Sequence, residues 1–193
     1  MNPRINIIIS RQLNQLKQKN PDGINVIIND IDIYDIQADI IGPVQTPYEG
    51  GVFRCKLILP QDFPKVPPKG FFHTKIAHPN VSEKGEICVN TLKKDWNPTN
   101  WSFQNIFEVI KCLLIVPFPE SALNEEVGKL FMENYEEYFK YAKLMTELHA
   151  KPRQSNKIQF EKEVNYIKIN QYIIKNNYTH IYVYITYFLN KDL

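Results

Sequence analysis

The order of apolar patterns along this chain of 193 residues predicts an α+β fold. A helical pattern comes first, four short β-prone runs follow it, and three helical patterns come last. Strands and helices that occupy separate parts of a chain are typical of α+β domains. We therefore expect an N-terminal helix, a four-stranded antiparallel meander, an irregular segment and C-terminal helices.

The N-terminal helix is predicted from apolar residues three or four positions apart. Pro3 suits the first turn of a helix, and a turn signal at residues 20–23 ends it. The apolar residues that share one helical face are Ile5, Ile9, Leu13 and Leu16. The β-prone runs that follow are separated by turn residues, which favours an antiparallel meander. Its four expected strands span residues 24–28, 33–41, 52–59 and 70–75.

Residues 77–99 lack any sustained helical or strand period. A long segment of this kind is usually functional or disordered. Ser102 can cap the next helix, which must end before Pro117 because proline removes a backbone donor. Two further helices are expected over residues 125–132 and 134–149.

Composition excludes several classes of protein. With 44% hydrophobic residues the chain can form a core, and a net charge of +2 predicts no nucleic-acid partner. No window approaches the roughly 18 apolar residues that a membrane span requires. Three cysteines are too few for a disulfide framework, and none has zinc-site spacing. Free thiols and the lack of a signal peptide lead us to expect a cytoplasmic or nuclear protein.

Charge and composition change near residue 151. Residues 1–150 carry 16 Lys and Arg against 18 Asp and Glu, whereas residues 151–193 carry 7 against 3. All 7 glycines precede the change, and the residues after it are rich in Ile, Asn, Lys and Tyr. We therefore predict a folded domain over residues 3–150, followed by a basic tail over 151–193 that is disordered or atypical.

Candidate chemistry lies in the irregular segment at residues 78–90. Cys88 can form a thioester because a thiolate is strongly nucleophilic. The amide of Asn80 could donate a hydrogen bond to a developing oxyanion. His78 could be a base or a structural donor, and a structural role in a proline turn is the favoured interpretation.

The other two thiols are expected in the core. Cys55 lies within a β-prone run, and Cys112 lies in a helical run beside two leucines. Cys88 has a glycine and charged residues as neighbours, so a reactive thiol and a buried inert one both remain open for it. Composition and spacing do not decide between them.

The residues themselves resemble a known family. His78-Pro79-Asn80, Cys88 eight residues after Asn80, and Asp95-Trp96 resemble the signature of ubiquitin-conjugating enzymes. The resemblance extends over residues 3–150. Within the family the chain is most similar to the S-type enzymes, which elongate ubiquitin chains with the anaphase-promoting complex. The similar segments are residues 20–24, 68–71, 85–90, 111–115, 119–126 and 134–138.

The resemblance implies a role for each candidate residue. Cys88 would accept ubiquitin from the activating enzyme and pass it to a lysine amine. Asn80 would assist by direct hydrogen bonding or by shaping the loop, and His78 would hold the turn. Ser121 stands where many family members carry an acid, so Glu120 or Glu125 could orient the acceptor instead. Glu125 could equally be a first-turn carboxylate that complements a helix dipole.

The resemblance also implies the partners: ubiquitin, its activating enzyme and a ubiquitin ligase, with no metal or organic cofactor, and it favours a monomer. Three departures from the S type are notable. Phe118 replaces the usual Asn between two prolines, which alters the rim of the site. The loop at residues 97–101 is one residue longer and, with Phe63 and Lys65, lies where family members often meet ligases, so the choice of ligase is in doubt. The tail also lacks the Leu-Arg-Arg-Leu ending of S-type enzymes.

Three rival functions remain open. The chain could carry a ubiquitin-like modifier other than ubiquitin, which the S-type resemblance disfavours. It could be an inactive, ubiquitin-binding variant of the same fold, although such variants typically lack the site cysteine. A cysteine peptidase using Cys88 and His78 is the third, and no second His/Asn constellation supports it.

Overall fold

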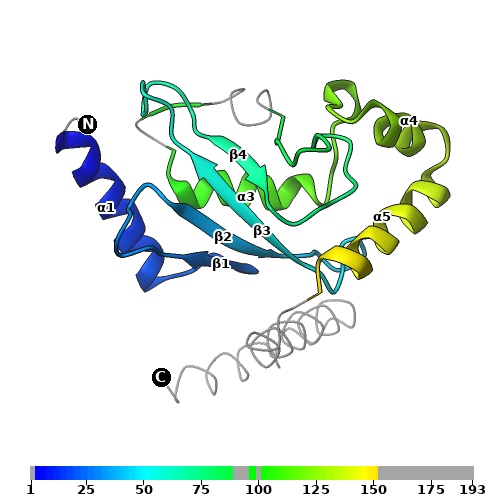
Figure 1. Cartoon of the computed structure of the whole chain (residues 1–193), viewed down its shortest axis with the longest axis horizontal. Coiled ribbons are helices and arrows are strands. Elements are labelled where there is room, and N and C mark those ends of the chain that lie inside the picture. Colours follow the sequence, from blue (N-terminus) through cyan, green and yellow to red (C-terminus); the bar gives the residue numbers. More distant parts are fainter. Residues whose placement is uncertain (1–2, 89–95, 99–100, 152–193) are drawn as a thin grey trace, which may run out of the picture. The chain divides into compact units, whose positions relative to one another are not determined.

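The computed structural model describes residues 3–88, 96–98 and 101–151. A helix, four strands and then further helices follow one another along this part of the chain, so the predicted α+β order is confirmed (Figure 1). No helix among the described residues is long and apolar enough to cross a bilayer. The predicted tail, apart from Lys151, lies outside the described residues.

The elements are α1 (Pro3–Gln18), β1 (Ile24–Ile27), β2 (Ile36–Ile41), β3 (Val52–Ile58), β4 (Lys69–Phe72), α3 (Phe103–Leu113), the 3-10 turn η1 (Pro119–Ser121), α4 (Glu125–Glu133) and α5 (Tyr135–His149).

The four strands form an antiparallel sheet in the order β1-β2-β3-β4. Alternate residues of β3 point into the core, because successive side chains of a strand face opposite ways. Phe53, Cys55 and Leu57 are fully buried there, whereas the next residue along from each is only partly covered. On the outer face the register pairs Asp39 with Arg54, whose guanidinium makes two hydrogen bonds to the carboxylate.

Helix α3 covers the inner face of this sheet (Figure 1). Ser102 caps it as predicted, accepting a hydrogen bond from the Asn105 backbone. The buried residues of α3 recur at helical spacing: Phe103, Ile106, Phe107, Ile110 and Leu113. Cys112 is exposed, so its predicted core position is wrong: it lies one residue before the buried Leu113, off that face. Cys55 is in the core as predicted.

Helices α4 and α5 follow one another beyond α3, and α5 is joined to the start of β3. The Val52 backbone donates to the Ala150 carbonyl, at 2.7 Å. Deeper in the core, the hydroxyls of Tyr48 and Tyr138 lie 2.8 Å apart, and Tyr48 also donates to the Ala77 carbonyl at 2.9 Å. This chain of hydrogen bonds ties α5 to the residue that precedes His78.

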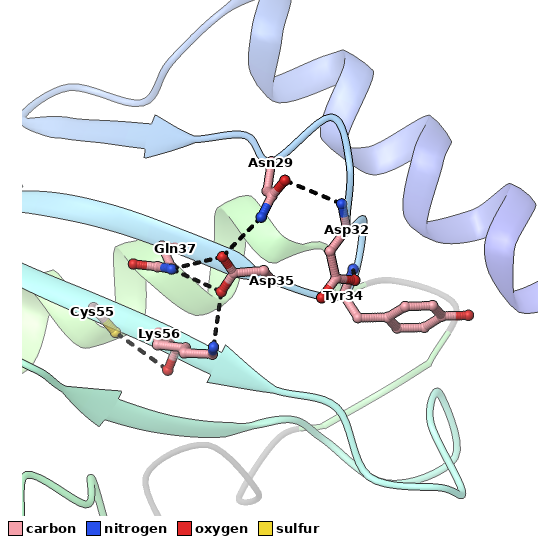
Figure 2. A network of polar contacts seen from close by, with 7 residues as sticks. All are labelled: Asn29, Asp32, Tyr34, Asp35, Gln37, Cys55 and Lys56. Atoms are coloured by element: carbon pink, nitrogen blue, oxygen red, sulfur yellow. Dashed lines mark hydrogen bonds and ion pairs between the residues drawn. The ribbon is translucent and has the colours of Figure 1, made fainter.

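The loop between β1 and β2 is organised by polar side chains (Figure 2). Asp32 accepts from the Tyr34 backbone and its own carbonyl accepts from the Asp35 backbone, which closes a turn. The second strand therefore begins at Ile36, three residues later than predicted. The Asp35 carboxylate lies between the side chains of Asn29, Gln37 and Lys56, with its ion pair to Lys56 at 2.8 Å.

Hydrogen bonding to Lys56, then to Gln37 and Asn29, lowers the pKa of Asp35 to about 2. A carboxyl whose pKa is lowered by folding stabilises the protein above its unfolded pKa of about 3.9, and this stabilisation is lost as the pH falls toward 2. We expect Asp35→Asn to lower the melting temperature at pH 6 and to differ less from wild type at pH 2.5. Thermal unfolding followed by circular dichroism measures this. Asp62→Asn, at an exposed carboxyl, is the control; an equal pH dependence in both variants would contradict the expectation.

Candidate active site

A small hairpin brings Cys88 next to Asn80. Val81 and Ile87 form an antiparallel bridge, and the Cys88 backbone N–H donates to the Asn80 carbonyl at 3.0 Å. Between them Ser82 closes the turn, because its carbonyl accepts from the backbone of Gly85 at 2.8 Å. The spacing of eight residues between Asn80 and Cys88 is thus the length of one hairpin whose two ends are paired.

Gly85 is required in this hairpin on two grounds. Its φ of +87° lies in the left-handed region, which residues with a Cβ rarely occupy. A Cβ at this position would also lie 2.2 Å from the Phe72 carbonyl oxygen. The close approach lets the Phe72 backbone donate to the Gly85 carbonyl at 2.8 Å, while Ile87 donates to the carbonyl of Gly70 at 2.9 Å. The hairpin is therefore fixed to β4.

His78 is fully buried and both of its ring nitrogens are occupied. The Asn80 backbone N–H donates to Nδ1 at 2.9 Å, so Nδ1 carries no proton. Nε2 lies 2.8 Å from the Leu113 carbonyl and must then be the protonated nitrogen that donates to it. That carbonyl belongs to the last turn of α3, where carbonyls lack partners within the helix. This geometry favours the structural role over the general base.

The side chain of Asn80 is likewise fully buried, and its amide is committed to a neighbouring segment. Nδ2 donates to the carbonyls of Phe118 and Ser121, at 2.6 and 3.0 Å, and Oδ1 accepts from the Phe118 backbone at 2.8 Å. Both amide protons are used. Of the two roles expected for Asn80, the one that shapes the loop matches this arrangement.

The adjoining residue Pro79 extends the same junction. Its carbonyl accepts from the backbones of Leu123 and Asn124, at 2.8 and 3.1 Å. Ser121 is the last residue of η1 and is half-buried. Its carbonyl accepts a hydrogen bond from the Asn80 side chain. Glu125 is exposed in the first turn of α4, which the Asn124 side chain caps, so the helix-dipole interpretation of Glu125 fits its position.

Burial in the sheet keeps the thiol of Cys55 protonated. Burial raises the pKa of Cys55 to about 12, which makes it unreactive near neutral pH. Cys88 is buried at the end of the hairpin. Within the described residues, no three His, Cys, Asp or Glu side chains gather into a group that could hold a metal ion.

Sequence reasoning placed Cys88, Asn80 and His78 in one segment but missed several residues that build the site. Neither Tyr48 nor Tyr138 was expected near it, although a buried tyrosine hydroxyl needs a partner and could have drawn attention. Phe118 was noted as unusual. Its backbone contact with Asn80 follows only from the fold.

Burial lowers the pKa of His78 to about 4, and the hydrogen bond to the Leu113 carbonyl partly opposes this shift. Its unfolded pKa is about 6.5, so the unfolded chain binds the extra proton first as the pH falls from 6.5 toward 4. The neutral His78 ring therefore makes its full contribution to the free energy of unfolding only above about pH 6.5. We expect about 2–3 kcal/mol of it to be lost between pH 7.5 and 4.5.

Urea unfolding at both pH values measures this loss, and His78→Asn should remove that part of the pH dependence. His73→Asn, at an exposed histidine, should not. A nitrogen-detected NMR spectrum of wild type at pH 6 reports the tautomer independently. A protonated Nδ1, or an imidazolium, would contradict the assignment.

Replacing Asn80 by alanine should unfold the junction around it. The change leaves one backbone N–H and two carbonyls without their partner, and each buried unsatisfied group costs about 1–3 kcal/mol. We expect the free energy of unfolding to fall by about 2–4 kcal/mol in urea titrations. Asn14→Ala, at an exposed position on α1, should change it by less than about 0.5 kcal/mol. Equal effects of the two substitutions would argue against a junction held by Asn80.

Known proteins are similar to this chain over most of its folded part. The model of the family "Ubiquitin-conjugating enzyme" matches residues 8–146. The chain is 58% identical over 149 residues to "Ubiquitin-conjugating enzyme E2 S" of Nematostella vectensis, which covers 77% of this chain and 72% of that protein. It is also 58% identical over 145 residues to "Ubiquitin-conjugating enzyme E2 22" of Arabidopsis thaliana, covering 75% of this chain and only 57% of that relative.

A solved structure shares the fold. The E2 domain of a Toxoplasma gondii ubiquitin conjugating enzyme superposes with a TM-score of 0.67 at 37% identity, over 74% of this chain and 97% of that one. The family match spans the sheet, the hairpin that ends at Cys88 and nearly all of α5. The sequence resemblance is confirmed, and the chain belongs to the ubiquitin-conjugating enzyme family.

Proposed function

We propose that this chain accepts ubiquitin from the activating enzyme as a thioester on Cys88 and transfers it to lysine amines. The observation that carries the proposal is the hairpin that pairs Cys88 with Asn80 inside a domain of this family. Cys55 is buried in the sheet with a raised pKa, and Cys112 lies on the outside of α3. Cys88 is therefore the thiol that the junction organises.

The first step is an exchange of thioesters. The Cys88 thiolate attacks the thioester carbonyl of ubiquitin bound to the activating enzyme, and the sulfur of that enzyme leaves as a thiolate. Leaving group and nucleophile are chemically alike, so the step requires little further stabilisation of charge. The Asn80–Cys88 backbone bond keeps the nucleophile at a fixed place during the exchange.

In the second step a lysine amine attacks the new thioester and an oxyanion develops on the carbonyl. Because both amide protons of Asn80 are donated to Phe118 and Ser121, its contribution is to fix the segment that faces the acceptor. Direct donation to the oxyanion would require one of these bonds to break. The lysine must also lose a proton, and a site that excludes water lowers its pKa.

Similarity to the E2 S relatives supports a finer proposal, that the chain elongates polyubiquitin with a ligase such as the anaphase-promoting complex. The expected partners are then ubiquitin, its activating enzyme and that ligase. A different ubiquitin-like modifier is the alternative. Transfer of such a modifier would use the same chemistry, and the charging experiment below distinguishes it from ubiquitin.

We expect the full chain, mixed with activating enzyme, ATP and ubiquitin, to form an adduct on a non-reducing gel that thiol reagents remove. Cys88→Ala should abolish it, whereas Cys112→Ala, at an exposed thiol, should leave it intact. A parallel reaction with a second ubiquitin-like protein tests the modifier. No adduct with either modifier, when the activating enzyme charges another carrier, would overturn the proposed function.

A further inference from the structure

A buried pair of tyrosines joins α5 to the residue that precedes the turn at residues 78–80. Tyr48, between β2 and β3, and Tyr138 of α5 are both buried. Their hydroxyl oxygens lie 2.8 Å apart, and the Tyr48 hydroxyl lies 2.9 Å from the carbonyl oxygen of Ala77. The rings of Tyr48 and His78 also face each other, with centroids 5.8 Å apart. Tyr48 therefore meets the turn at two points, the carbonyl before His78 and the His78 ring.

The direction of these hydrogen bonds follows from the number of protons. A phenol has one proton to donate, and a carbonyl oxygen can only accept. The Tyr48 hydroxyl therefore donates to Ala77, and the Tyr138 hydroxyl donates to the oxygen of Tyr48. Burial raises the pKa of both hydroxyls, that of Tyr138 to about 12, so both keep their protons near neutral pH.

This direction makes the two hydroxyls unequal. Loss of the Tyr48 hydroxyl leaves the Ala77 carbonyl without this donor, whereas loss of the Tyr138 hydroxyl leaves the bond to Ala77 in place. The two tyrosines share one hydrogen bond and are both buried, so they differ chiefly in their link to the turn.

The Ala77 carbonyl belongs to the peptide unit that carries the nitrogen of His78. That unit is planar, so its orientation sets where the His78 backbone begins. The Asn80 backbone N–H donates to Nδ1 of His78, and the Asn80 carbonyl accepts from the Cys88 backbone. A rotation of the Ala77 peptide is therefore passed on to the residues that hold the site.

We propose that Tyr48 is a positioning residue for the transfer step, and that its hydroxyl orients the turn at residues 78–80 through the Ala77 carbonyl. The inference rests on the proposed function and deepens it. Tyr48 is fully buried, so it acts through Asn80, which fixes the segment around Phe118. The exchange that charges Cys88 needs little help from that segment, whereas attack by lysine uses it. The hydroxyl therefore affects the second step and spares the first.

Two substitutions that each delete one buried hydroxyl test this proposal. The full chain is charged with ubiquitin, the activating enzyme is quenched, and loss of the thioester to excess free lysine is timed. We expect Tyr48→Phe to charge as wild type does and to discharge about fivefold more slowly, the rate effect of one hydrogen bond. Tyr138→Phe is the matched control, because it keeps the donation to Ala77, and should stay within about twofold of wild type.

Two unnatural residues at position 48 separate the donor from the volume of the side chain. 4-Aminophenylalanine keeps an N–H donor for the Ala77 carbonyl and should restore the wild-type rate. 4-Fluorophenylalanine fills similar space without a donor and should be as slow as Tyr48→Phe. This pair decides the question even if the space left by phenylalanine disturbs the core. Circular dichroism at the assay temperature checks that each variant is folded.

A spectroscopic readout follows the turn directly. The side-chain amide signal of Asn80 in a proton–nitrogen NMR spectrum should shift in Tyr48→Phe and stay in place in Tyr138→Phe. Wild-type discharge by Tyr48→Phe, equal slowing in both phenylalanine variants, or equal rates for the two unnatural residues would overturn the inference. None of these outcomes touches the charging of Cys88. A wild-type chain that fails to charge would instead overturn the proposed function and this inference with it.

Discussion

The buried turn at residues 78–80 is the constraint on which the active-site architecture depends. Its side chains and carbonyls reach the end of α3, the segment around η1, the start of α4 and Cys88. Each partner is itself a backbone group that would be costly to leave unsatisfied in the interior. These segments therefore cannot move independently, and Cys88, the segment around η1 and the last turn of α3 are held in fixed positions relative to one another.

The same constraint explains why the most polar residues of the motif lie inside the protein. His78 and Asn80 are both fully buried, although catalysis would seem to call for exposure. Burial is tolerated because every donor and acceptor on the two side chains has a partner. Burial also holds His78 neutral, since it lowers the pKa of the ring to about 4. The turn stays fixed across the neutral pH range because neither side chain changes its charge there.

Much of the fold was predictable because it follows local rules. The face of α3 is visible in the spacing of its apolar residues, and Ser102 caps it as its side chain suggests. The strands of the meander were found with errors of one to three residues at their ends. β4 ends three residues earlier than predicted, and β2 begins three residues later because a side-chain turn at Asp32 competes with the β-prone sequence. The prediction for Cys112 was wrong because it relied on the two leucines that follow it. Helical geometry turns Leu113 toward the core and leaves Cys112 exposed.

The sequence by itself determined the order of elements and the family, because apolar spacing and the motif residues can be read along the chain. Only the tertiary structure decided that the segment without a period forms a hairpin pairing Cys88 with Asn80. It also decided what Asn80 does with its amide and which carbonyl the His78 ring binds. The bonds of His78 to Leu113 and of Asn80 to Phe118 join residues more than thirty positions apart. No local period or propensity records such contacts, because they arise from how separately folded segments pack together.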